Sequence, residues 1–264
     1  VPSWFFCIPL FFYFPLGLCL VAVRFSIGIN AFLLAVIFTK LPVLRRFLLR
    51  IMCTVLGFIV FVEDANNYSS KVKIVVSNHV TKFDHLAVSL IISTIVPSVW
   101  ELPLYLTWAL GYADFGASQG RQVLLHNVRE FMKDSSTPLL IFPEGTTTNG
   151  KKGLLKFNLW PFLLSEAVQP IRIKVARPKL MQVAFSVVGS RWWSDLFWFL
   201  FVPYTVFRIR FLPVAEKEDT ESAEMFCNKV QKQICKELGL EVTTFTSADK
   251  VEYTKYILKE DGKH

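Results

Sequence analysis

Charged residues are nearly missing from two stretches of this 264-residue chain. Residues 1–39 contain only Arg24, and residues 192–207 contain only Asp195. The first stretch is apolar and long enough to cross a bilayer, which takes about 20 residues. The scarcity of charge therefore indicates contact with a membrane. A mean hydropathy of +0.42 and an aromatic content of 15% support this interpretation, because aromatic rings concentrate at membrane interfaces.

Two features of the N-terminal stretch argue against a simple membrane span. Pro15 and Gly17 interrupt the helical pattern, and the apolar run Phe25–Phe38 is too short to span a bilayer comfortably. We therefore predict that residues 1–39 form a helical hairpin inserted in one leaflet, with a single span as the rival. A signal peptide is a third possibility, but the stretch lacks the basic beginning of one.

Cysteine pairs and several enzyme motifs are also missing. The five cysteines are an odd number, two lie in the apolar N-terminus, and no C-x-x-C pair occurs. This argues against a disulfide framework or a zinc site and indicates a reducing, cytosol-facing domain. H-E-x-x-H, G-x-G-x-x-G and G-x-x-x-x-G-K-[ST] are absent, so metalloprotease, Rossmann and P-loop enzymes have no support.

The net charge of +8 makes the chain basic, so its partners could be nucleic acid or anionic lipid. Lys40, Arg45, Arg46 and Arg50 directly follow the apolar N-terminus, a position that favours lipid headgroups. No nucleic-acid-binding motif is visible, so we expect membrane lipid as a partner and no nucleic acid. Ordinary solubilising charge is the alternative interpretation, and it stays open for the scattered lysines after Lys217.

Beyond the N-terminus, the hydrophobic pattern predicts an α/β domain. The expected strands are 71–77, 138–142, 171–175, 183–188 and 209–214, and the expected helices are 84–95, 121–133, 217–238 and a short one from Ser247. Residues 97–105 are expected to be a connection and 111–120 a loop. The apolar stretch 192–207, with Pro203 inside it, reads as a core helix or an interfacial segment.

These elements suggest a division of the chain into four parts. We assign 1–39 to the membrane-inserted hairpin and 40–69 to a basic, amphipathic interfacial segment, helical over Arg45–Val62. Residues 70–215 would form the α/β domain, and 216–264 a C-terminal helical region.

Two strand-like runs each end in polar residues. Ile74–Ser77 leads into Asn78 and His79, and Asp84 follows after four intervening residues. Downstream, Leu139–Phe142 leads into Pro143-Glu144-Gly145-Thr146. Because ligands bind at the carboxyl ends of strands in open α/β sheets, we expect an enzyme site at this edge.

His79 and Asp84 are suited to act as a base and its orienting carboxylate. A neutral imidazole, with an ordinary pKa of about 6.5, can take a proton from a hydroxyl. The carboxylate can fix the tautomer and stabilise the imidazolium. Alternatively, Asp84 caps the following helix, and His79 is structural. A metal pair of His79 and His85 is a further rival, but no third ligand has suitable spacing.

The loop after the second strand offers glycine, hydroxyls and lysines in its Gly145–Lys152 segment. Such a loop can hold a phosphate through backbone N–H groups and charge. An ordinary polar turn is the simpler interpretation of this segment taken alone.

Together the two motifs resemble the glycerolipid acyltransferase (PlsC-like) superfamily. Residues 79–84 resemble its H-x-x-x-x-D block, and residues 142–146 its F-P-E-G-T block. The region Gly116–Arg121 sits where that family keeps a Gly and an Arg that meet glycerol phosphate, and Gln169–Ile171 where it has a proline-containing strand. The resemblance covers about residues 70–215 and implies a mixed central sheet flanked by helices.

This resemblance implies acyl transfer from acyl-CoA, as co-substrate, to a hydroxyl of a lysophospholipid or glycerol phosphate. His79 would be the general base, worth about 10²–10⁴-fold in rate, and Asp84 would orient it. No bound cofactor and no metal would be needed. The residues implied to bind substrate are Asn78, Arg121, Glu144, Gly145 and Thr146.

A second likeness is to the ancient ubiquitous proteins, a family on lipid droplets and the endoplasmic reticulum. It extends from the apolar N-terminus to near the end of the chain, through residues 77–85, 148–150, 153–155, 160–162, 201–206, 236–239 and 248–250. It implies a monotopic hairpin, a domain facing the cytosol, and partners in endoplasmic-reticulum quality control and associated degradation. The ubiquitin-related regions of that family lie beyond this sequence, so we expect a fragment, short isoform or reduced homologue.

Two functions are therefore predicted from different classes. The intact Glu144-Gly145-Thr146 block favours an acyltransferase, and we lean towards this. The second family likeness favours a non-catalytic scaffold that organises lipid droplets and supports protein degradation at the endoplasmic reticulum.

Overall fold

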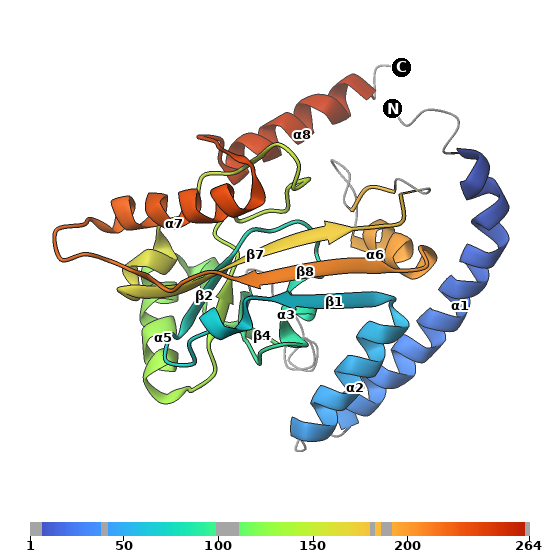
Figure 1. The fold of residues 1–264 in the computed structure, drawn as a ribbon, viewed down its shortest axis with the longest axis horizontal. Coiled ribbons are helices and arrows are strands. Elements are labelled where there is room, and N and C mark those ends of the chain that lie inside the picture. Colours follow the sequence, from blue (N-terminus) through green and yellow to red (C-terminus); the bar gives the residue numbers. More distant parts are fainter. Residues whose placement is uncertain (1–6, 38–41, 99–110, 180–182, 186–191, 262–264) are drawn as a thin grey trace.

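A mixed central sheet forms the middle of the computed structural model, which describes residues 7–37, 42–98, 111–179, 183–185 and 192–261 (Figure 1). Its strand order is β1-β8-β7-β2-β5, with β9 paired to β7. Of the pairs along that order, only β7 and β8 run antiparallel. The predicted α/β class with a mixed sheet is confirmed. The strands are β1 Phe58–Glu63, β2 Ile74–Ser77, β5 Leu139–Ile141, β7 Ala167–Ala176, β8 Thr205–Phe211 and β9 Ala215–Glu216.

Helices and small strand pairs surround this sheet. The helices are α1 Cys7–Ile37, α2 Pro42–Val55, α3 Asp84–Ser89, α5 Arg121–Asp134, α6 Trp192–Phe201, α7 Ala223–Leu238 and α8 Ser247–Asp261. Three short 3-10 turns are η2 Ala65–Asn67, η3 Ala117–Gln119 and η4 Trp160–Leu163. Two parallel pairs join β3 Val96–Ser98 to β4 Tyr112–Asp114, and β6 Gly153–Leu154 to β10 Glu241–Val242.

Several predicted elements occur close to their expected bounds. α5 matches 121–133. α7 ends as predicted before Gly239, whose φ of 69° is the left-handed conformation that glycine favours at a helix end, but it begins at Ala223 instead of 217, after the cap residue Ser222. α3 is shorter than the predicted 84–95, because Ile95 instead bridges to Leu139 beside β5. Most of the predicted connection 97–105 and half of the predicted strand 183–188 lie outside the described residues, and 183–185 are not in a strand.

The N-terminal stretch differs from the hairpin predicted within residues 1–39. Its described part is one continuous helix, α1, and α2 packs beside it as the second arm (Figure 1). Pro15 lies inside α1, and Gly17 serves packing, since a Cβ there would lie 2.4 Å from the Phe201 ring of α6. Ile8–Leu34 is long and apolar enough to cross a membrane.

The segment after α2 also differs from the prediction, which extended an interfacial helix to residue 62. Gly57, with φ of 75°, ends the helical path, and Phe58–Glu63 form β1 beside β8. Phe58 is buried while Ile59 is exposed, an alternation typical of a strand. The sheet therefore begins within the segment 40–69 that we assigned to the interface.

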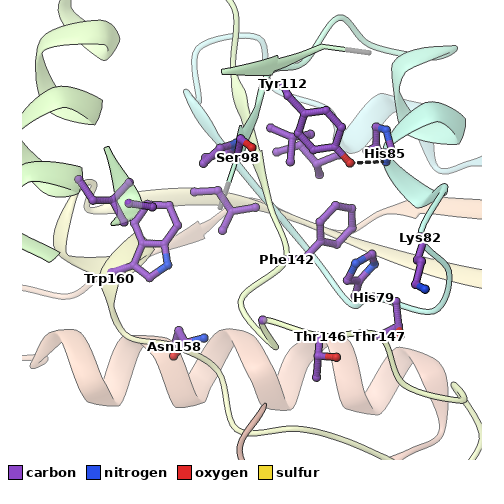
Figure 2. A pocket seen from close by; sticks show the side chains of 17 residues that line it. His79, Lys82, His85, Ser98, Tyr112, Phe142, Thr146, Thr147, Asn158 and Trp160 are labelled. Atoms are coloured by element: carbon purple, nitrogen blue, oxygen red, sulfur yellow. Dashed lines mark hydrogen bonds between the residues drawn. The ribbon is translucent and has the colours of Figure 1, made fainter. Parts of the chain in front are cut away.

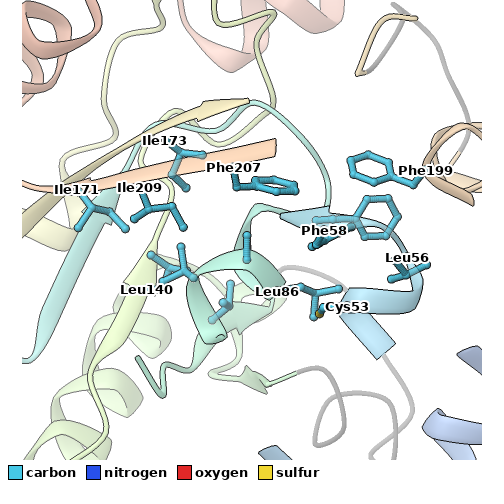
Figure 3. Close-up of a cluster of buried hydrophobic side chains, with 14 of the residues drawn as sticks. Cys53, Leu56, Phe58, Leu86, Leu140, Ile171, Ile173, Phe199, Phe207 and Ile209 are labelled. Carbon is cyan, nitrogen blue, oxygen red and sulfur yellow. The ribbon is translucent and has the colours of Figure 1, made fainter. Parts of the chain in front are cut away.

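Packed apolar side chains fill the space between the inner face of the sheet and its helices (Figure 3). Phe58 of β1 lies 4.8 Å from Phe207 of β8 and 5.5 Å from Phe199 of α6, measured between ring centroids. Leu86 of α3 and Leu140 of β5 complete the cluster near the carboxyl end of β2. This core holds the start of α3 in place, and α3 begins at Asp84.

Arg24, the single charge of the first 39 residues, joins α1 to the end of α6. Its Nη1 donates to the carbonyls of Leu200 at 3.0 Å and Val202 at 2.5 Å, and its Nη2 donates to Pro203 O at 2.5 Å. The last carbonyls of a helix have no partner within it. Arg24 therefore supplies donors that the end of α6 lacks.

We expect Arg24→Met to weaken this junction. Methionine keeps an apolar stem but removes the donors, and an unsatisfied buried carbonyl costs about 1–3 kcal/mol. Thermal unfolding of the detergent-solubilised protein should show a lower midpoint than wild type. Arg50→Met, at an exposed position of α2, is the matched control. Equal midpoints for wild type and Arg24→Met would contradict the role.

Candidate active site

His79 and Asp84 meet at the carboxyl end of β2, where the chain turns into α3. His79 Nδ1 lies 3.0 Å from Asp84 Oδ2, which also accepts the backbone N–H groups of Val80 at 2.6 Å and Thr81 at 2.9 Å. The Thr81 hydroxyl donates to Asp84 Oδ1 at 2.6 Å. Asp84 is fully buried and binds the loop before α3, so it does not act as a side-chain cap of that helix.

This geometry fixes how the imidazole is presented. With the Asp84 carboxylate accepting at Nδ1, the neutral ring carries its proton there and leaves the Nε2 lone pair available. The Phe142 ring stacks on His79 with 4.2 Å between centroids and 20° between planes. Since Phe142 directly precedes Pro143-Glu144-Gly145-Thr146, the two sequence motifs come together here. The His79 side chain is 18% exposed, so a ligand can reach it.

A cavity of about 300 Å³ opens beside His79 (Figure 2). Its lining combines the motif residues with apolar groups from β3, β5 and α5 and aromatic rings from β4 and η4. Pockets of about this size and makeup bind small molecules. The lining residues are His79, Lys82, His85, Val96, Pro97, Ser98, Tyr112, Ala117, Leu124, Leu140, Ile141, Phe142, Gly145, Thr146, Thr147, Asn158 and Trp160.

Glu144 and Asn78 stand behind this cavity and do not line it. Glu144 Oε1 accepts the His79 N–H at 2.8 Å, and its Oε2 accepts the Leu155 N–H at 3.0 Å. Asn78 exchanges two hydrogen bonds with the Ile173 backbone, at 3.0 and 2.8 Å. Both side chains are fully buried. Their contacts hold the His79 loop against β7 and the chain after β6, and the substrate-binding role expected for them stays a prediction.

Burial raises the pKa of Glu144 to about 7. The two backbone N–H donors and Lys250 oppose this increase, and Asp84 adds to it. A carboxyl whose pKa is raised on folding contributes stability that is complete below its unfolded value, near 4.5, and is lost as the pH rises through about 7.

Glu144→Gln should therefore remove a pH dependence. As the pH rises from 5 to 8, we expect the unfolding midpoint of wild type to fall relative to that of Glu144→Gln, because glutamine cannot ionise. The stability of wild type should change mainly between the unfolded and folded pKa values of Glu144, about 4.5 and 7. Thermal scans of both proteins across this range measure the difference. A constant difference would show that Glu144 does not titrate there.

Of the remaining predicted site residues, the structure brings two into the cavity. Gly145, with φ of 69°, and Thr146 line it. Arg121 begins α5, is exposed, and is not among the lining residues. Arg121 was suggested by its place in the sequence, and its role in binding stays a prediction.

His85 and Tyr112 form a polar wall that the motifs did not indicate. The Tyr112 hydroxyl lies 3.3 Å from His85 Nδ1. Burial lowers the pKa of His85 to about 4, so its ring is neutral at physiological pH, and burial also raises the pKa of Tyr112. No group of three or more His, Cys, Asp or Glu among the described residues is arranged to hold a metal. Tyr112 comes from β4, where no local sequence signal marks it.

Residues 116–120 spell G-x-S-x-G, the pattern of a hydrolase nucleophile elbow. Ser118 lies in η3, is exposed, and does not line the cavity. Within the described residues, the only positive φ outside glycine belongs to Asp64, so Ser118 lacks the strained elbow conformation. The pattern therefore carries no nucleophile here.

Curated proteins similar to this chain are lipid-droplet factors. The lipid droplet-regulating VLDL assembly factor AUP1 homolog of Caenorhabditis elegans is 38% identical over 243 residues, covering 92% of this chain and 62% of the relative. AUP1 of Homo sapiens is 39% identical, covering 93% and 59%. The chain thus spans about 60% of the length of these relatives. The lysophospholipid acyltransferase LPEAT1 of Arabidopsis thaliana is 29% identical over 68% of this chain and 48% of its own.

A solved structure shares the fold. The 1-acyl-sn-glycerophosphate acyltransferase PlsC of Thermotoga maritima matches with a TM-score of 0.62 at 16% identity, covering 86% of this chain and 96% of that one. A search of family models finds no match. The predicted PlsC-like fold is confirmed.

Proposed function

Because this chain is a homologue of the AUP1 lipid-droplet proteins and has the PlsC acyltransferase fold, we propose that it is a membrane-associated acyltransferase. It would transfer a fatty acyl group from acyl-CoA to the hydroxyl of a lysophospholipid or of glycerol phosphate. The single observation that carries the proposal is the His79–Asp84 pair, with Nε2 available beside a largely apolar cavity.

The proposed reaction uses His79 as general base. Nε2 takes the proton of the acceptor hydroxyl while the hydroxyl oxygen bonds to the thioester carbonyl carbon. The bond from that carbon to sulfur then breaks, and the imidazolium returns the proton to the departing CoA thiolate. Asp84 holds the ring and stabilises its charged form during these steps.

The proposed location is the endoplasmic-reticulum membrane and the lipid-droplet surface, with the catalytic domain facing the cytosol. α1 supplies a long apolar helix, and exposed Phe11 and Phe12 on it suit a lipid environment. Trp192 and Trp193 of α6 are exposed as well, and α6 packs against α1. Such aromatic side chains settle at the headgroup level, which would keep the cavity close to insoluble substrates.

A non-catalytic scaffold is the second candidate function, and the names of the AUP1 relatives favour it. In that case the apolar α1 and α6 would matter most, and His79 little. Proteins of endoplasmic-reticulum quality control would be its partners. Lipid-droplet number in cells expressing His79→Ala discriminates the two, since the scaffold predicts no change from wild type.

The direct test is an acyl-transfer assay on detergent-purified protein. Radiolabelled acyl-CoA would be offered with a panel of lysophospholipids and with glycerol 3-phosphate. We expect labelled product with at least one acceptor. Folded, membrane-bound protein that labels none of them would refute the acyltransferase and leave the scaffold.

A further inference from the structure

The C-terminal helix α8 reaches the candidate site although it lies outside residues 70–215. Strand β10 pairs in parallel with β6, and the Lys156 N–H donates to Phe245 O at 2.7 Å. Residues 241–245 therefore lie alongside residues 153–156, which come shortly after Glu144 in the chain. The start of α8 is then fixed by a reciprocal cap. The Thr246 N–H donates to Asp249 Oδ2 at 2.6 Å, and the Asp249 N–H donates back to Thr246 Oγ1 at 3.3 Å.

This placement brings Lys250, which does not itself line the cavity, against two residues that do. Its Nζ donates to Thr146 Oγ1 at 3.1 Å and to the carbonyl oxygen of Thr147, and both threonines line the cavity. The contact continues at Gly145, where an added Cβ would lie 3.5 Å from Ser247 Oγ. α8 is therefore packed directly on the Glu144-Gly145-Thr146 loop.

A second ammonium group, that of Lys82, belongs to the cavity lining, whereas Lys250 contacts that lining through Thr146 and Thr147. Lys82 lines the cavity beside His79 and pairs with Asp195 Oδ2 at 2.8 Å. Lys250 is half-buried, and its two hydrogen bonds end on neutral oxygens. The nearby Glu144 carboxyl already accepts two backbone N–H groups.

Charged groups of both signs surround Lys250. Burial lowers the pKa of Lys250, Lys82 lowers it further, and Glu144 and Asp195 raise it. A phosphate group beside Thr146 would accept charge-assisted hydrogen bonds from these ammonium groups.

We propose that Lys250 of α8 binds a phosphate group of the substrate at the end of the cavity beside His79, together with Lys82 and the Thr146 hydroxyl. The identity of the ligand rests on the proposed function, in which the phosphate belongs either to the acceptor or to CoA. α8 is then part of the site, and it sets where the phosphate-bearing substrate lies relative to Nε2.

Binding measured without turnover tests this proposal. Calorimetric titrations of the full chain in detergent would use glycerol 3-phosphate and CoA as separate probes, with no acyl donor present. We expect Lys250→Met to weaken at least one dissociation constant by about tenfold or more, and Lys250→Arg to weaken it less. Lys255→Met, on the exposed part of the same helix, should bind like wild type.

The pattern of losses identifies the source of the phosphate. Weakened binding of glycerol 3-phosphate alone assigns the site to the acceptor, of CoA alone to the donor, and of both to a shared site. Wild-type affinity in Lys250→Met, or no binding of either probe by wild type, would overturn the proposal. Intact binding without any acyl transfer would instead count against the proposed function and leave this site standing.

Discussion

Replacing His79 with alanine is expected to lower acyl transfer by about 10²–10⁴-fold, because the reaction loses its base. The fold should survive, since the side chain is partly exposed and loses only its Nδ1 contact with Asp84 and its stacking on Phe142. Initial rates with the best acceptor, compared with the unfolding midpoint of the same preparation, measure both effects. His126→Ala, at an exposed position of α5, is the matched control and should keep wild-type rates.

Full activity in a folded His79→Ala protein would remove His79 from the mechanism and with it the acyltransferase proposal in its present form. A loss of activity that accompanies unfolding would be uninformative on its own, so His79→Gln serves as the second variant. Glutamine can keep one hydrogen bond to Asp84 but cannot carry the proton, and we expect it to be as inactive as alanine.

Changing Asp84 should affect activity and stability in separable ways. Its carboxylate satisfies the His79 ring, the backbone N–H groups of Val80 and Thr81, and the Thr81 hydroxyl. Asp84→Ala leaves these buried donors unpaired, at about 1–3 kcal/mol each, and should lower the unfolding midpoint sharply. Asp84→Asn can turn its amide oxygen towards the three N–H groups, so it should fold but lose the charge that stabilises imidazolium.

For Asp84→Asn we expect acyl transfer to fall by about 10²–10⁴-fold, close to the loss in His79→Ala. The double variant should be no slower than either single one if the two residues act as a unit. Rates and thermal midpoints of wild type, the two single variants and the double variant test whether His79 and Asp84 act together. Asp219→Asn, at an exposed position, is the control. Additive losses in the double variant would contradict a shared role.

Short-range patterns accounted for the elements that carry the two motifs. β2 and β5 are short apolar runs, and α5 and α7 show helical periodicity, so each could be predicted from its own residues. The His79–Asp84 pair was equally accessible, because both residues belong to one turn between β2 and α3. The resemblance of the two blocks to one family then predicted that they share a site.

Long-range contacts decided the places where prediction and structure differ. Proline and glycine suggested a break in the N-terminal stretch, but Phe201 of α6 fills the space beside Gly17, and the helix continues. Phe58–Glu63 looked like the end of an amphipathic helix, but pairing with β8 makes it a strand. Phe201 and β8 are both far in sequence from the segments they contact, so a short stretch of sequence could not have predicted either contact.

The sequence by itself determined the α/β class, the apolar character of the N-terminus and the catalytic candidates His79 and Asp84, because periodicity, composition and a five-residue spacing are local properties. Only the tertiary structure decided which predicted residues face the cavity. It placed Glu144 behind the His79 loop, turned Arg121 to the surface, and brought Lys250 against Thr146. These outcomes depend on how β10 pairs with β6 and where α8 packs, which are contacts between segments about 90 to 100 residues apart.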